Sequence, residues 1–324
     1  MTNNATAPGA KAQKPAKTPK ARKDMTKLEY YWAEAKAKWV GYVMVAPFLI
    51  MFFAFTIVPV VLSIFLSFTN FNMLEWPDFT FMDNYVRMLL EDDLFLTAFQ
   101  NTLMFAIITG PASYIISFVV AWFINELPPK VRAFVTFIFY APSISGNAYL
   151  VWALLFQGDI YGFVNGWLFK MGLITDPIVF FKNTTYIVPL CIMVALWQSL
   201  GTGFLANIAG LQGVDRSLYE AGAIDGIKNR WQELWYITLP SMKQILLFGA
   251  VLAITGSFGF GPVVTALCGT PSTDYVAWTL NHHLTEFMTT RFEFGYASAI
   301  SVVLFAIMIS ANWLVQKMLS KVGT

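Results

Sequence analysis

The sequence carries little charge for its length. Of its 324 residues, 12% are Asp, Glu, Lys or Arg, whereas 57% are apolar and 17% aromatic. A soluble domain carries about 25% charged residues. This deficit excludes an ordinary soluble domain and indicates an all-α integral membrane protein.

Cysteine and histidine are also scarce. Cys191 and Cys268 form no Cys-x-x-Cys or Cys/His cluster, so the sequence suggests neither a metal site nor a disulfide framework. We interpret both as small buried apolar residues. We expect the only adjacent histidines, His282 and His283, to be polar surface residues of an external loop.

Two features of self-powered transport are missing. The sequence contains no Gly-x-x-x-x-Gly-Lys loop for nucleotide phosphates. Its apolar runs hold no ionisable Asp, Glu, Lys or Arg well inside their bounds, whereas ion-coupled carriers usually place such residues at membrane depth. Sodium sites built from carbonyl groups are the exception. Energy is therefore expected to come from a partner.

Six apolar runs each reach the ~20 residues that cross a bilayer as a helix. They lie at about 39–68, 98–124, 133–156, 187–210, 244–267 and 294–317. If the N-terminus is cytosolic, 17 of the 21 Lys and Arg residues fall on the cytosolic side. The positive-inside rule therefore predicts six membrane helices with both termini in the cytosol.

The predicted domains follow from these runs. Residues 1–38 form a basic cytosolic tail, disordered over 1–24 and followed by a possible interfacial helix. Residues 39–324 form the six-helix transmembrane domain, with a polar cytosolic loop at about 211–241. We prefer a solvated tail to nucleic-acid binding for the lysine run.

The loop reads as two short helices around a glycine. Ser217 and Glu220 have capping-box spacing, so a helix is expected to start there. Gly226 can adopt the left-handed conformation that ends it. Asn229 and Gln232 offer a similar second start.

At these residues the chain resembles a family. Glu220-Ala221-Gly222, Asp225-Gly226 and Leu239-Pro240 are similar to the signature loop of the membrane subunits of binding-protein-dependent ABC importers. Gly210-Leu211-Gln212 ahead of Tyr219 resembles the carbohydrate branch, which includes the maltose permease subunits. Gly222 departs from the family's usual alanine and weakens the helix by up to about 1 kcal/mol if exposed.

The resemblance implies a type I ABC importer permease fold with six transmembrane helices and a cytosolic coupling helix between helices 4 and 5. It implies that this helix docks on an ATPase subunit and that Glu220 pairs with a basic group there. The coupling residues would be Ser217, Tyr219, Glu220, Ala221, Gly222, Asp225 and Gly226.

It also implies what assembles around the chain. The chain itself would be no enzyme and bind no cofactor, with ATP and Mg held by two copies of a cytosolic ABC ATPase. The other partners would be a second similar permease subunit, an extracellular or periplasmic solute-binding protein, a sugar substrate and the lipid of a prokaryotic cytoplasmic (inner) membrane.

Uncharged polar residues near mid-bilayer are the candidates for the substrate path. They are Gln198, Ser199, Thr202, Asn207, Thr255, Ser257, Asn147 and Tyr149. Hydroxyl and amide groups suit a neutral polyol such as a sugar, because they both donate and accept hydrogen bonds. Such residues are also the usual contacts between membrane helices. The alternatives are a similar importer for another solute such as a glycerol phosphate, an ion-coupled carrier or channel, and a structural scaffold.

Overall fold

The computed structural model describes residues 26, 31, 32, 34 and 36–319. The disorder predicted for 1–24 lies outside the described residues. Among those described, the regular secondary structure is helical apart from one isolated bridge between Thr69 and Phe79, and turns and irregular segments connect the helices. The chain divides at Val61 into two compact units, residues 1–61 and 62–324, which are described separately.

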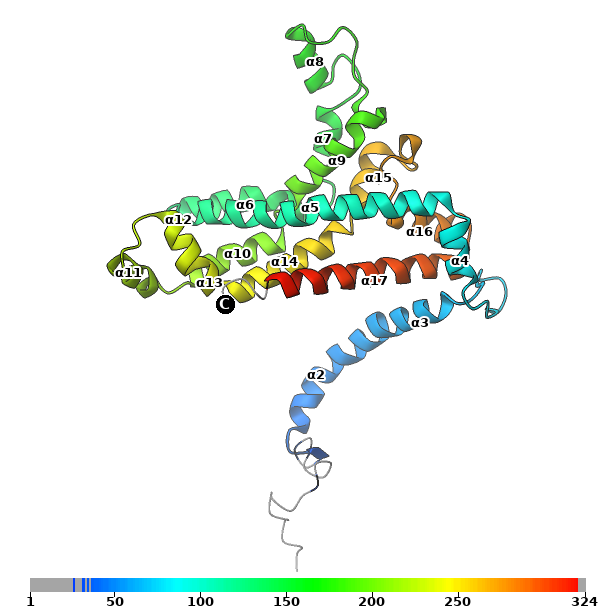
Figure 1. Ribbon diagram of the computed structural model, residues 1–324, viewed down its shortest axis with the longest axis horizontal. Helices are drawn as coiled ribbons and strands as arrows, with labels where there is room; N and C mark the ends of the chain where they lie inside the picture. The colour runs from blue at the N-terminus through cyan, green and yellow to red at the C-terminus, as the bar shows by residue number, and fades with distance from the viewer. Residues whose placement is uncertain (1–25, 27–30, 33, 35, 320–324) are drawn as a thin grey trace, which may run out of the picture. The chain divides into compact units, whose positions relative to one another are not determined.

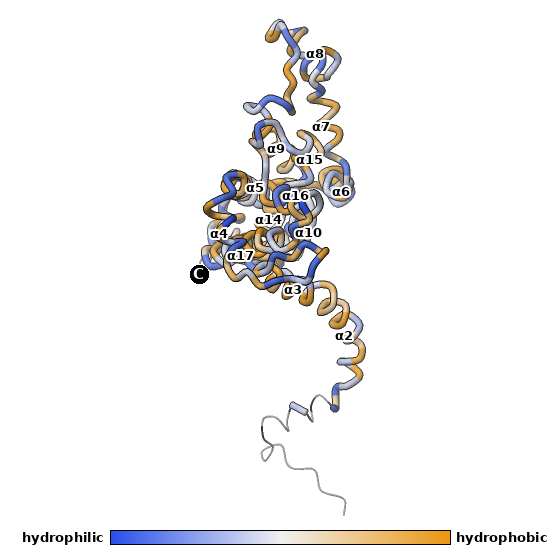
Figure 2. Tube along the Cα trace, turned by 90° about the vertical axis from the view of Figure 1, so that its right-hand side faces the viewer, coloured by the Kyte–Doolittle hydropathy of each residue, from blue (hydrophilic) through white to orange (hydrophobic). Residues whose placement is uncertain are grey.

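The first unit is dominated by one apolar helix. α2 (Trp39–Phe52), the π-helical segment η2 (Phe53–Ile57) and α3 (Val58–Leu66) follow one another as a single 28-residue helix. Most of its residues are apolar (Figure 2), and most are exposed. Pro59 lacks the N–H that would bond the Phe55 carbonyl, which accounts for the π segment beside it. A helix that is apolar on every side is suited to lipid.

The second unit is a helix bundle built around α5 (Asp93–Asn125). α10 (Thr202–Gly213) and α14 (Lys243–Ser257) pack against α5, and α17 (Phe294–Leu319) packs against α14 (Figure 1). Most buried positions along α5 are small, as at Ala106, Gly110, Ser113, Ser117 and Ala121. Small residues at three- and four-residue spacing let membrane helices approach closely.

Among the described residues, three helices are long and apolar enough to cross a membrane: Trp39–Leu66, Asp93–Asn125 and Phe294–Leu319. Two bent pairs raise the number to as many as five. α9 (Thr184–Gln198) meets α10 at 43°, and Arg230–Ser241 meets α14 at 83°. The prediction of an all-helical membrane protein is therefore confirmed.

The six predicted runs are helical over most of their length, but three are divided. Run 187–210 is split at residues 199–201, between α9 and α10. Run 133–156 is split between α6 (Pro129–Ile144) and α7 (Leu150–Leu155). Run 244–267 is split between α14 and α15 (Gly261–Cys268) by the turn that contains Gly259. Periodicity does not locate such breaks, because the sequence stays apolar across them.

Shorter elements complete the second unit. They are α4 (Asp83–Leu90), α8 (Phe163–Lys170), the 3₁₀ turns η3 (Phe180–Lys182) and η5 (Thr273–Tyr275), and α16 (Leu280–Thr289). α7 and α8, with the start of α9, extend away from the bundle (Figure 1). α4, α16 and the starts of α5 and α17 gather at one end of the bundle (Figure 1).

The prediction that His282 and His283 are surface residues is wrong. Both lie on α16, with 6% and 1% of their surface exposed. The His282 ring bonds Thr279 at the start of the helix, and the His283 ring reaches Asp92 of a distant segment. Burial of such rings is favourable because each polar atom finds a partner.

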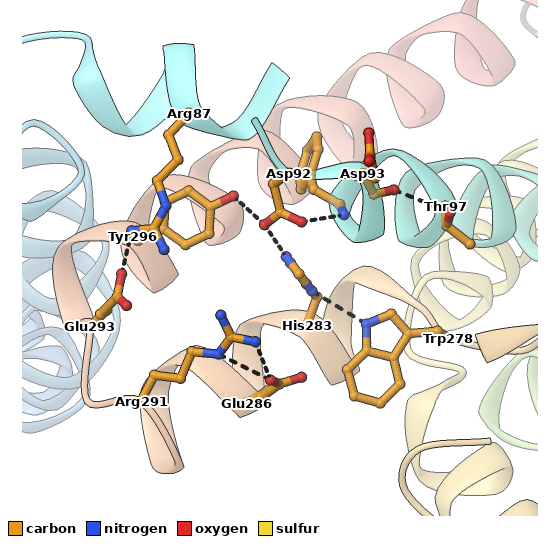
Figure 3. A network of polar contacts seen from close by, with 11 residues as sticks. Arg87, Asp92, Asp93, Thr97, Trp278, His283, Glu286, Arg291, Glu293 and Tyr296 are labelled. Carbon is orange, nitrogen blue, oxygen red and sulfur yellow. Dashed lines mark hydrogen bonds and ion pairs between the residues drawn. The ribbon is translucent and has the colours of Figure 1, made fainter. Parts of the chain in front are cut away.

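Asp92 anchors a polar network at this end of the bundle (Figure 3). It caps α5 by accepting from the Phe95 N–H at 2.9 Å, and it accepts from the Tyr296 hydroxyl at 2.7 Å. His283 Nε2 lies 2.9 Å from Asp92 Oδ2, the oxygen that also accepts from Tyr296. Because Trp278 Nε1 donates to His283 Nδ1 at 3.3 Å, the ring proton is assigned to Nε2, which donates to Asp92. The network joins α5, α16 and α17.

These contacts set the charge of Asp92. Burial raises the pKa of Asp92, but hydrogen bonds from Tyr296, the Phe95 N–H and His283 outweigh it, so the pKa lies below the ordinary 3.8. Beside this network, Arg87 pairs with Glu293 and lies 4.5 Å from the Tyr296 ring centre. The hydrogen bond to Glu293 raises the pKa of Arg87.

Asp92→Asn is expected to lower the thermal unfolding temperature of the purified protein by several degrees near pH 7. A hydrogen-bonded charge removed from such a site costs about 1.5–3 kcal/mol. Since the folded pKa is lowered, the stabilisation is present above pH 3.8 and is lost as the pH falls below that value through the folded pKa. Unfolding temperatures measured between pH 7 and 3 should therefore converge in acid. Equal temperatures for the two proteins at pH 7 would contradict the assignment.

Candidate functional site

A cavity of about 370 Å³ lies inside the bundle, beside the middle of α5; we call it the central cavity. Its lining comes from α5, α9, α10, α14, α15 and the turns between them. The lining residues are Thr109, Ser113, Tyr114, Ser117, Ala195, Gln198, Ser199, Thr202, Gly203, Gly249, Leu252, Ala253, Gly256, Ser257, Gly259, Phe260 and Val263.

Two features of the chain open this space. The 43° bend between α9 and α10 parts the wall, and Ser199 Oγ donates to the Leu196 carbonyl at 2.6 Å where α9 ends. On α14 the lining residues Gly249, Ala253 and Gly256 have little or no side chain. Small side chains at a helix bend therefore leave a hollow inside a closely packed bundle.

The cavity wall is largely apolar, offers several hydrogen-bonding side chains and carries no charge. None of its described lining residues is Asp, Glu, Lys, Arg or His. Gln198 is half-buried and Thr202 exposed, and neither side chain has a hydrogen-bond partner among the residues described. These amide and hydroxyl groups can donate to and accept from a neutral ligand.

Four of the eight substrate-path candidates meet at this cavity: Gln198, Ser199, Thr202 and Ser257. The other four do not line it. Asn207 is buried next to it and donates to the lining Ser117 at 3.2 Å, whereas Thr255 accepts from Asn312 of α17 at 3.3 Å. Asn147 accepts from the Tyr149 hydroxyl at 3.0 Å, away from the central cavity.

The sequence analysis missed the contribution of α5. Thr109, Ser113 and Ser117 line the cavity at four-residue spacing, which places them on one face of the helix. That hydroxyl stripe in run 98–124 is the signal that could have identified them.

The loop 211–241 forms a compact unit of short helices. It contains α11 (Arg216–Ile224), α12 (Arg230–Glu233), the π segment η4 (Leu234–Thr238) and α13 (Leu239–Ser241). Gly226 adopts φ +93°, the left-handed turn predicted, and Asn229 caps α12 by accepting from the Gln232 N–H at 2.9 Å. These two predictions are confirmed.

The predicted start of the first helix is displaced. Asp215, rather than Ser217, caps α11, and its carboxylate accepts from the Ser217 N–H at 2.9 Å. That hydrogen bond lowers the pKa of Asp215. An aspartate at the N-cap also satisfies the helix dipole, and it stands two residues before the serine that was expected.

α11 has one packed face and one exposed face. The Tyr219 hydroxyl lies 2.9 Å from Thr238 Oγ1. Gly222 is buried so closely against η4 that a Cβ there would stand 2.6 Å from Ile237 Cδ1. Glu220 and Ile224 are both exposed, with 87% of Ile224 accessible, and Glu220 also lines the rim of a recess between the loop and the end of α5. Gly222 therefore allows the close approach, and the opposite face is left free for a partner.

The loop is tied directly to α5. Arg230 bonds Glu126, just past the end of α5, at 2.7 Å and Glu233 at 2.7 Å. Its hydrogen bond to Glu233 raises the pKa of Arg230. The Trp231 and Trp122 rings lie 5.1 Å apart. The helix that lines the central cavity thus also holds the loop, through contacts that sequence analysis did not foresee.

An uncharged cavity inside a membrane helix bundle, with an exposed helix held against one end, defines the class of membrane transport subunits. No family model matches the chain. A probable ABC transporter permease of Bacillus subtilis, YesP, is 30% identical over 273 residues, covering 82% of this chain and 86% of the relative. The lactose transport system permease LacF of Rhizobium radiobacter is 30% identical, covering 82% and 88%. The chain therefore belongs to the family of ABC transporter permease proteins.

Other relatives agree. The arabinooligosaccharide permease AraP of Bacillus subtilis is 27% identical, covering 91% of this chain and 94% of the relative. Among solved structures, a bacterial ABC transporter that imports the acidic polysaccharide alginate matches with a TM-score of 0.74 at 22% identity, covering 91% of this chain and all of that one. The same kind of transporter, in complex with an alginate pentasaccharide-bound periplasmic protein, matches at 0.71. The family resemblance inferred from sequence is confirmed.

Proposed function

We propose that the chain is one of two membrane subunits of an ATP-driven importer for an uncharged sugar or oligosaccharide. The observation that most directly supports this proposal is the central cavity, whose described lining offers hydroxyl and amide groups but no charged side chain. Sugars are recognised by such groups. The names of the lactose and arabinooligosaccharide permeases support the same substrate class.

The proposed topology has six spans, both termini in the cytosol and the α11 loop on the cytosolic side of a prokaryotic inner membrane. The helical character of all six runs and the distribution of Lys and Arg support it. An inner membrane permease of Escherichia coli among the relatives is consistent with this location.

In the proposed mechanism the exposed face of α11 docks on a cytosolic ATPase subunit. Closure of two ATPase copies around ATP and Mg moves α11, and Arg230 and Trp231 pass the displacement to α5. α5 lines the central cavity, so its tilt alters access to the sugar. A binding protein delivers the sugar from the other side.

Uptake by purified protein in liposomes tests this proposal. The chain assembled with its second permease, ATPase and binding protein is expected to take up radiolabelled neutral oligosaccharides only when ATP is supplied on the ATPase side. The chain alone is expected to give no flux. Flux through the chain alone without ATP would indicate a carrier or channel, and uptake restricted to glycerol phosphate would refute the sugar assignment.

Gln198→Ala is expected to raise the KM for sugar uptake about 2- to 10-fold. The variant removes one hydrogen-bonding side chain from the cavity wall, and a neutral hydrogen bond contributes about 0.5–1.5 kcal/mol. Initial uptake rates over a range of sugar concentrations measure the change. Gln157→Ala, at an exposed glutamine outside the cavity, is the matched control. An unchanged KM in Gln198→Ala would place the sugar elsewhere.

A further inference from the structure

A second cavity, of about 840 Å³, lies at the end of the bundle opposite α11; we call it the distal cavity. It is lined by α15, η5 and α16, with Tyr149 from the segment before α7. Its polar lining includes Thr265, Thr285, Thr289, Asn281, Glu286 and Tyr275. It is thus more than twice the volume of the central cavity, and its lining likewise combines apolar surface with several hydrogen-bonding side chains.

Only a short turn separates the two cavities. Gly259 lines both of them and is exposed, and the turn continues through Phe260 on the central side and Pro262 on the distal side. Phe260 is held in place by stacking on Phe105 at 4.3 Å. The residue at the boundary therefore has no side chain, while its neighbour is fixed.

The wall of the distal cavity is rigid. Trp278 stacks on His282 with ring centres 5.2 Å apart, and His282 is within 3.0 Å of Thr265 Oγ1. Asn281 Nδ2 donates to the Phe258 carbonyl at 2.7 Å, which fixes α16 to the turn after α14. A preformed wall of this kind avoids the ordering cost of binding.

Tyr275 is held at the cavity against its backbone preference. Its φ is +56°, a left-handed value that is unusual for a bulky residue. Its ring packs edge-on against Trp278 at 5.4 Å, and no hydrogen-bond partner of its hydroxyl is found in the described part of the chain. Strained residues with a free polar group are typical of ligand sites.

We propose that the distal cavity is a second saccharide subsite, which holds the trailing units of an oligosaccharide while its leading end occupies the central cavity. This proposal rests on the proposed function. Ligand pockets measure about 300–1,000 Å³, so the central cavity alone suits a small sugar and the two together suit a longer chain. Aromatic rings, hydroxyls, an amide and the Glu286 carboxylate are suitable partners for sugar hydroxyls. Oε1 of Glu286 already accepts from Arg291, so Oε2 is the oxygen that would meet a sugar.

Cysteine protection in the assembled importer tests the proposal. In a background with Cys191→Ala and Cys268→Ala, single variants Thr202→Cys in the central cavity and Thr285→Cys in the distal cavity are labelled with a maleimide. Met288→Cys, exposed on α16 but not lining the cavity, is the matched control. The probes are neutral gluco-, galacto- and arabino-oligosaccharides of one to six units.

The expected result is a dependence on chain length. The shortest sugars protect Thr202→Cys only, whereas longer chains slow labelling of both Thr202→Cys and Thr285→Cys at least fivefold and leave Met288→Cys unaffected. Protection of Thr202→Cys at every length, with Thr285→Cys always labelled freely, would overturn the second subsite and leave the proposed function standing. Protection of neither position would overturn both.

A functional variant gives an independent measure. Tyr275→Phe combined with Glu286→Gln removes one hydroxyl and one charge from the distal cavity and keeps both side-chain shapes. Because Glu286 also pairs with Arg291, Arg291→Gln alone is the control for loss of that ion pair. The ratio of long-chain to short-chain uptake is expected to fall about tenfold. An unchanged ratio in a double variant that folds normally would count against the subsite.

Discussion

Glu220→Lys is expected to reduce ATP-driven sugar uptake by more than 100-fold while the protein still folds and inserts. Glu220 lies on the exposed face of α11, and its carboxylate has no hydrogen-bond or ion-pair partner among the described residues. Substitutions at such positions usually change stability by no more than about 0.5 kcal/mol. In the proposed assembly the carboxylate meets a basic group of the ATPase, and breaking a buried charge pair costs about 3–5 kcal/mol.

The measurement is uptake in liposomes together with ATP hydrolysis by the same preparation. Uptake should be lost because α11 no longer docks, and the amount of co-purified ATPase subunit should fall. Glu75→Lys, the same charge reversal at an exposed position outside the loop, should leave uptake and the amount of co-purified ATPase subunit unchanged. Normal uptake by Glu220→Lys would exclude α11 as the coupling element.

Gly256→Phe is expected to abolish uptake by filling the central cavity. Gly256 lines the cavity on α14, and a Cβ at this position meets no atom within 4 Å. A phenylalanine ring can therefore enter a space of about 370 Å³ without displacing the backbone. Uptake of every sugar should be lost, whereas the unfolding temperature and the association with ATPase should stay near those of the unmodified protein.

Gly41→Phe is the matched control, because a Cβ at Gly41 of α2 also meets nothing within 4 Å and the residue lines none of the cavities described. Ser257→Leu would also reduce the volume of the central cavity, but it would disturb helix packing as well. The Ser257 Oγ lies 3.3 Å from the position of a Cβ on Gly110, so a larger side chain there would also part α14 from α5. Substantial sugar uptake by a folded Gly256→Phe protein would show that the sugar takes another route.

The sequence identified local features better than distant contacts. Gly226 and Asn229 were predicted correctly because a turn and a cap depend on neighbouring residues. His283 was misjudged because its partner, Asp92, is 191 positions away in the chain. A burial of this kind has no local signature.

Only part of the lining of the central cavity could be identified from the sequence, because the lining also depends on contacts between distant helices. Gln198 and Ser257 were named from polarity alone, and the structure brings them together. Thr255 has the same polarity but faces α17, where it serves helix packing. Ser113 was overlooked, since a serine between membrane helices resembles ordinary interface packing. Deciding between the two roles requires the rotation of each helix about its axis.

The Asp92 network bears on the movement of α5 in the proposed mechanism. Hydrogen bonds from Tyr296 and His283 hold Asp92, the residue that caps α5, so the helix would swing about that end. At 1.5 Å per residue, Ser113 stands about six-tenths of the way from Asp92 to Glu126. In the proposed mechanism, a sideways displacement of Glu126 would therefore reach Ser113 reduced to roughly six-tenths of its size. The position of the Asp92 network would thus set how far the wall of the central cavity moves for a given movement of the loop.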